Sequence, residues 1–123
     1  MVKIYLRSIV KDEKEHLVMF DSNGDGDISN GDINNLITKV PSGAKVIWKL
    51  DRFSRIKRIT KISSKTGAHN VFKSDPRKLL LCKGFKLRVP ETKETISEQY
   101  NIEYTLNDGK NKKIDPYIRV EPV

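Results

Sequence analysis

The chain has 123 residues, 37% of them hydrophobic, which suffices for one modest core and excludes a second, so we predict a single domain over residues 1–123. Its 24 Lys and Arg residues outnumber its 16 Asp and Glu residues, and the resulting charge of +8 favours contact with anions such as nucleic acid, phosphates or acidic surfaces. A lone cysteine excludes an internal disulfide, and because we find no signal peptide and no membrane-spanning run, we expect a cytoplasmic protein without membrane contact.

The first third of the chain mixes strand and helix patterns. Apolar and polar residues alternate from Val2 to Arg7, which is the period of a half-buried strand. Leu17 to Phe20 is continuously apolar and fits a buried strand or a helix end equally well. Ile33 to Val40 has the apolar spacing of one helix face, but it is short and contains poor helix formers, so a strand stays open there.

From Pro41 onward the pattern is that of strands separated by turns. Alternation of apolar residues with basic or polar ones predicts strands at 44–50, 56–64, 85–89, 100–106 and 114–120. Asn107-Asp108-Gly109 is a hairpin turn signal between the last two. Pro116 lacks a backbone donor, so the final strand should lie at an edge or begin there. The charged stretch from Glu91 to Glu98 is expected to be a long surface loop.

These elements predict an all-β fold. Seven to eight short strands, with no sustained helix after residue 40, are typical of a Greek-key β-sandwich, here with an acidic loop inserted between its early strands. The alternative is an α+β fold in which a lone EF-hand helix-loop-helix precedes a β-sheet.

Residues 21–32 form the acidic loop, which is the sharpest motif in the chain. Asp21, Asn23 and Asp25 alternate, Gly26 follows, and Asp32 closes a loop of twelve residues, as in an EF-hand calcium loop. Oxygen ligands of this kind suit a hard cation, and the crowded carboxylates repel one another without one. The predicted metal ligands are Asp21, Asn23, Asp25, Asp27 through its backbone carbonyl, and Asp32.

Two features of the acidic loop keep alternatives open. Asp32 is one methylene shorter than the glutamate that the motif prefers, so the expected affinity for Ca²⁺ is modest and Mg²⁺ is a rival. EF-hands usually occur in pairs, and the sequence holds no second loop of this kind. The other interpretation is a connection rich in Asp, Asn and Gly because these residues tolerate left-handed backbone.

Basic residues gather around the predicted strand at 56–64. If its outer face joined that of the strand at 44–50, a patch for phosphate groups would form from Lys45, Lys49, Arg55, Lys57, Arg58 and Lys61. Phe53 is the one aromatic residue interleaved with these cations, and base stacking needs more. A solvated sheet face is therefore the favoured interpretation, with nucleic acid as the less favoured ligand.

The sequence contains no motif for catalysis. His16, His69 and Cys82 are not spaced as metal ligands or catalytic partners, and no phosphate-binding glycine loop or nucleophile elbow is present. We therefore predict a non-catalytic binding or assembly module that binds Ca²⁺ through the acidic loop, and the alternative is a basic anion- or nucleic-acid-binding domain. A protein partner, or self-association through an edge strand near Pro116, would fit the first function.

Two segments resemble known β-sandwich families. The run from Pro41 to Asp51, PSGAKVIWKLD, resembles the proline/glycine turn and tryptophan-bearing strand of cupredoxin-like domains. The run from Asp115 to Val120, DPYIRV, is similar to the last strand of small bacterial β-sandwich proteins of the inclusion-body (PixA/AidA) type. The resemblance implies a two-sheet Greek-key sandwich. It implies no copper site, because a blue-copper centre needs two His and a Cys, and neither His nor Met follows Cys82.

Overall fold

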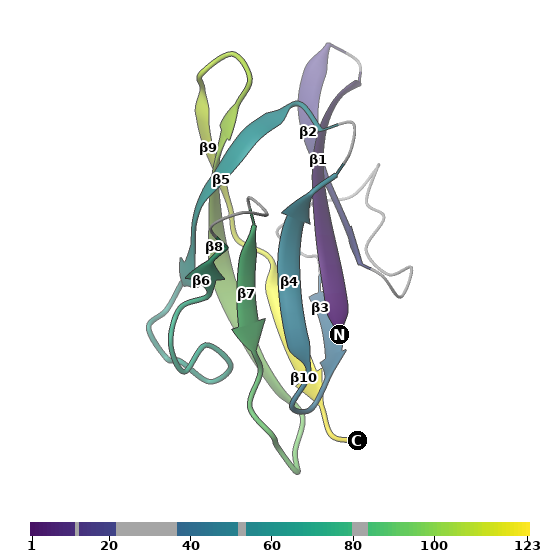
Figure 1. The fold of residues 1–123 in the computed structure, drawn as a ribbon, viewed down its shortest axis with the longest axis vertical. Helices are drawn as coiled ribbons and strands as arrows, with labels where there is room; N and C mark the ends of the chain where they lie inside the picture. Colours follow the sequence, from purple (N-terminus) through teal and green to yellow (C-terminus); the bar gives the residue numbers. More distant parts are fainter. Residues whose placement is uncertain (12, 22–36, 52–53, 80–83) are drawn as a thin grey trace.

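The computed structural model of the protein describes residues 1–11, 13–21, 37–51, 54–79 and 84–123. Within these residues the chain forms β-strands and no helix, and the strands build two sheets of mixed direction that form a sandwich-like fold (Figure 1). The predicted all-β class is confirmed. In the same residues no helix is long and apolar enough to cross a membrane.

The first sheet consists of β1 (Val2–Lys11), β2 (Lys14–Asp21), β4 (Lys45–Leu50), β6 (Arg77–Lys78) and β7 (Phe85–Arg88). Their order in the sheet is β2-β1-β4-β7-β6. β1 and β4 run parallel, whereas β7 runs antiparallel to β4 and to the short strand β6. The centre of this sheet is therefore made by strands that are far apart in sequence.

The second sheet consists of β3 (Ile37–Pro41), β5 (Ile56–Ser64), β8 (Ile96–Leu106), β9 (Asn111–Ile114) and β10 (Tyr117–Glu121). The order is β3-β10-β8-β5, and β9 pairs with the upper part of β8 through a hairpin at the predicted turn (Figure 1). In that hairpin the N–H of Gly109 donates to the carbonyl of Leu106 at 2.9 Å, and Gly109 has a φ of +89°. Glycine adopts this left-handed conformation without a steric cost. The single strand predicted at 114–120 is wrong, because Ile114 ends β9 and β10 begins at Tyr117.

Three aromatic side chains lie in the core. Trp48 of β4 and Tyr100 of β8 face each other from opposite sheets, and Phe72 from the β5–β6 connection joins them. The ring centroids lie 5.2 to 6.0 Å apart in tilted or edge-on arrangements, which are the favoured geometries for aromatic pairs. The indole Nε1–H of Trp48 donates to the hydroxyl of Tyr100 at 3.2 Å, so both buried polar groups have a partner.

Both flanks of the acidic loop are strands. Leu17 to Phe20 lies in β2, which pairs with β1, and Ile37 opens β3, which pairs with β10. The helix interpretation is therefore wrong on the first flank and over the second half of Ile33 to Val40, while residues 33–36 lie outside the described residues. Short apolar runs fit either element, and long-range pairing with β1 and β10 selects the strand.

Two further sequence expectations are corrected by strand pairing. β10 begins directly after Pro116, as one form of the prediction allowed, but it lies between β3 and β8 and is not an edge strand. The predicted surface loop from Glu91 to Glu98 ends early, because β8 starts at Ile96. Glu98 is inside that strand and its side chain is buried, with 4% of its surface exposed.

β5 carries its buried residues at every third position and not at every second. Ile56, Ile59 and Ile62 are buried, and the two residues after each of the first two isoleucines are exposed. Two register shifts against β8, at Ile56/Arg58 and Ile59/Lys61, produce this spacing. A bulge adds one residue to a strand and so moves the following side chains to the other face. The predicted strict alternation was wrong for this strand.

Candidate anion-binding site

Most of the predicted metal site lies outside the described residues. The backbone of Asp21 ends β2, while Asn23, Asp25, Asp27 and Asp32 belong to residues 22–36 and have no described structure. In the described part of the chain, no three side chains of His, Cys, Asp or Glu gather as they would around a metal ion. The acidic loop is therefore still a prediction from sequence.

The six predicted anion-binding residues are divided between the two sheets. Lys45 and Lys49 lie on β4 in the first sheet, and Lys57, Arg58 and Lys61 lie on β5 in the second, with Arg55 directly before it. On β4 the alternate residues Val46 and Trp48 are buried, so the lysines lie on the outer face of their sheet. The two groups of cations do not share the continuous face that the prediction assumed.

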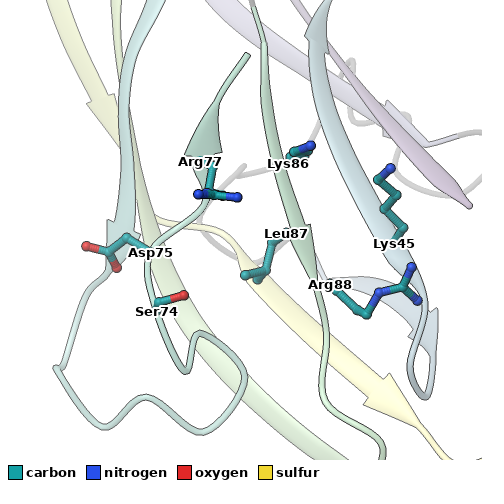
Figure 2. A pocket seen from close by; sticks show the side chains of 7 residues that line it. All are labelled: Lys45, Ser74, Asp75, Arg77, Lys86, Leu87 and Arg88. Carbon is teal, nitrogen blue, oxygen red and sulfur yellow. The ribbon is translucent and has the colours of Figure 1, made fainter. Parts of the chain in front are cut away.

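A different set of cations surrounds a cavity of about 390 Å³ on the first sheet (Figure 2). Its walls are formed by β4, β7, the start of β6 and the loop before β6. The lining residues are Lys45, Ser74, Asp75, Arg77, Lys86, Leu87 and Arg88. This volume lies within the range of small-molecule sites in proteins. We call this feature the cationic pocket.

Strand register brings the four cations of the cationic pocket together. Lys45 lies directly opposite Arg88 across the β4–β7 pair, and Arg77 lies directly opposite Lys86 across the β6–β7 pair. Lys86 and Arg88 are two residues apart on β7, so their side chains share one face of the sheet. The neighbouring residue Phe85 is buried in the core, which fixes that face as the outer one.

The loop wall of the cationic pocket is held by contacts with the core and with β5. The carboxylate Oε1 of Glu98 accepts the backbone N–H groups of Val71 and Phe72 at 2.8 and 3.1 Å. Farther along the loop, Oδ1 of Asp75 accepts the backbone N–H of Ser64 at 3.2 Å. These contacts position Ser74 and Asp75 beside Leu87 without using any cationic side chain.

The four cations lie together without an ion-pair partner among the described carboxylates. The ion pairs found join other residues, namely Arg7 with Asp51, Lys65 with Asp115, and Lys110 with Asp108. Like charges directly opposite each other on paired strands destabilise the sheet. Arg88 is held in place because its Nη1 donates to the carbonyl oxygen of Gly43 at 2.9 Å. Its guanidinium keeps further N–H groups for a ligand.

Sequence reasoning found one member of this site, Lys45, and missed the others. The alternation in the predicted strand at 85–89 already indicated that Lys86 and Arg88 face outward. The sequence did not reveal that this strand pairs with β4 on one side and with Arg77 on the other. Those two pairings bring together Lys45 and Arg88, which are 43 positions apart, and Arg77 and Lys86, which are nine positions apart.

Of the residues considered for catalysis, the structure describes the side chain of His69 alone, and His69 does not line this cavity. His69 lies in the exposed β5–β6 connection, where its Nδ1 is 2.6 Å from the carbonyl oxygen of Phe72 and therefore carries the proton that is donated. Cys82 lies outside the described residues, and for His16 the structure describes the backbone alone.

No family model matches the chain, and no curated protein matches it.

Proposed function

We propose that the protein is a non-catalytic binding module whose cationic pocket holds an anion of the phosphate type. The observation that carries this proposal is the pair of like-charged cross-strand contacts, Lys45 with Arg88 and Arg77 with Lys86, at one cavity. Four cations face one lining carboxylate, that of Asp75, whose Oδ1 already accepts a backbone N–H. A bound anion adds an attraction to each cation of a pair, and these attractions offset the repulsion between the two cations.

The chemistry of the lining favours an oxyanion such as phosphate over a halide. Two of the cations are arginines, whose planar guanidinium groups match the oxygens of phosphate with paired hydrogen bonds. The hydroxyl of Ser74 adds a neutral donor at the opposite wall. Because Lys45, Arg77 and Arg88 are exposed, each contact is screened by water and salt, and binding should weaken as ionic strength rises.

Isothermal titration with inorganic phosphate at low salt tests this function. We expect saturable binding in the wild type and a loss of about tenfold in affinity in the double variant K86Q/R88Q, since charged hydrogen bonds contribute about 1.5–3 kcal/mol before screening. The control is K57Q/R58Q, which removes the same charge from exposed positions on β5. Equal loss in both variants would show that net charge, and not the pocket, binds phosphate.

The acidic loop is a second candidate site, favoured by its ligand spacing. We propose that it binds Ca²⁺, with Mg²⁺ as the rival ion, in a connection that runs from β2 to β3 and therefore joins one sheet to the other. A strand on each side means that such a site would not be the helix-loop-helix of a calcium sensor. Calorimetric titration of the wild type and of D21A/D25A with each ion measures this binding. If neither ion gives heat with the wild type, the acidic loop is not a metal site.

We further propose that the sandwich is of the Greek-key, cupredoxin-like kind. The support is the tryptophan-bearing strand β4, which follows the turn at Pro41 to Gly43, and the parallel pairing of β4 with β1. In the turn, the N–H of Ala44 donates to the carbonyl of Pro41 at 3.1 Å, and Gly43 has a φ of +74°. A crystal structure that shows how residues 22–36 connect β2 to β3 would test this assignment.

A further inference from the structure

We infer that the cationic pocket contains two anion subsites and selects a small bisphosphate whose two phosphoryl groups are held apart by a carbon skeleton. This inference rests on the proposed function and specifies its ligand. Each subsite is one cross-strand pair: Lys45 with Arg88 forms the first, and Arg77 with Lys86 forms the second. The pairs lie on opposite sides of β7, so one phosphate cannot be centred on both.

Sheet geometry gives the distance between the two subsites. Lys86 and Arg88 are separated by two residues, or about 7 Å along β7. The first pair lies over the space between β4 and β7, and the second over the space between β7 and β6, so their centres also differ by about 4.8 Å across the strands. The diagonal between the subsites is therefore about 8 Å. Two phosphoryl groups that share one bridging oxygen cannot span it.

The lining of the cationic pocket favours a small molecule over a nucleic-acid strand. Leu87 is the one apolar residue of the lining, and it packs partly against the core from the face of β7 opposite Lys86 and Arg88. Among the lining residues there is no aromatic ring on which a base could stack. Figure 2 shows Arg77, Lys86, Arg88 and Lys45 spread across the strands, with Ser74 and Asp75 on the loop beside Leu87. A cavity of about 390 Å³ accommodates a phosphorylated sugar.

Calorimetric titration with four probes tests the two-subsite arrangement. Fructose 1,6-bisphosphate should bind at least tenfold more tightly than fructose 6-phosphate, because the second phosphoryl group binds as part of the same molecule. Pyrophosphate and a single-stranded oligonucleotide should each bind less tightly than the sugar bisphosphate. In K45Q/R88Q and in R77Q/K86Q, the affinity for the bisphosphate should fall to about the affinity for the monophosphate. The affinity for the monophosphate should fall about twofold in either variant.

Each contrary outcome has a separate meaning. If pyrophosphate matches the sugar bisphosphate, or if one double variant leaves bisphosphate binding unchanged, there are not two separated subsites. Tightest binding by the oligonucleotide would replace the small-molecule ligand with a nucleic acid. If no phosphate probe binds the wild type saturably, the proposed function itself fails. The variant K57Q/R58Q serves as the control of equal charge and should change the affinity for the two fructose phosphates by less than about twofold, since it alters the long-range attraction alone.

Discussion

Glu98 links the core of the sandwich to the wall of the cationic pocket. Its side chain points inward from β8, and Oε1 accepts two backbone N–H groups of the loop that continues to Ser74 and Asp75. Oε2 is buried and has no hydrogen-bond partner among the described residues. Burying a carboxylate is costly, so its position is explained by the two loop amides, which would otherwise be buried without an acceptor.

Replacing Glu98 should separate the role of its oxygen atoms from that of its charge. Glu98→Ala leaves the N–H groups of Val71 and Phe72 unsatisfied, and we expect it to lower the free energy of unfolding by about 2–4 kcal/mol. Glu98→Gln keeps an acceptor oxygen and should change stability by less than about 1 kcal/mol. Urea denaturation with an unchanged m-value measures both. Equal destabilisation by the two substitutions would assign the effect to the charge.

Tyr100 gives the protein a defined sensitivity to alkaline pH. Burial raises the pKa of its phenol well above the usual range, and the hydrogen bond from Trp48 offsets part of that rise. The unfolded phenol loses its proton above about pH 10, whereas the folded one keeps it. The unfolded state then binds fewer protons, so the stability present below pH 10 should fall by about 1.4 kcal/mol per pH unit above it.

Unfolding measured between pH 9 and pH 11.5 checks this slope. Tyr100→Phe removes the titrating group and keeps the ring in the core, so its stability should decline less steeply than that of the wild type. Identical slopes in the two proteins would contradict the assignment of the pH dependence to Tyr100.

At the scale of the element, local patterns predicted most strands but not their partners. The alternation at Val2 to Arg7 and 100–106 lies within β1 and β8, and that at 44–50 and 85–89 matches β4 and β7 to within one residue, because one buried face imposes a period of two. Sequence could not show the bulges of β5, which depend on its register with β8. The cationic pocket was missed for the same reason, since Arg77 and Lys86 meet through pairing alone.

The spacing of three in β5 can be tested by substitutions at neighbouring positions. Ile59→Ala removes a buried side chain with 2% of its surface exposed, and we expect a loss of about 2–4 kcal/mol in stability. Thr60→Ala removes one exposed hydrogen bond to the carbonyl of Glu103 and should cost less than about 1 kcal/mol. Strict alternation from Ile56 would bury Thr60 and expose Ile59. Thermal and urea unfolding measure both effects. A larger loss of stability for Thr60→Ala than for Ile59→Ala would support strict alternation and contradict the spacing of three.

At the scale of the whole molecule, the charge of +8 is distributed over both sheets. The cations of β5 are exposed on one sheet, while four cations of the other sheet surround the cationic pocket. Net charge gives a long-range attraction for any anion, whereas the pocket adds a fixed arrangement of donors. Steep salt dependence is therefore expected of both surfaces, and the position of the bound anion is what distinguishes them.

The most direct test is a ¹H–¹⁵N NMR titration with inorganic phosphate at low salt, which locates the anion on the chain. The account predicts saturable shifts at the amides of Lys45, Ser74, Asp75, Arg77 and Lys86 to Arg88, and weaker, non-saturable changes along β5. Saturable shifts centred on Lys57 to Lys61, or no saturable shift at any residue, would contradict the assignment of the cationic pocket as the anion site.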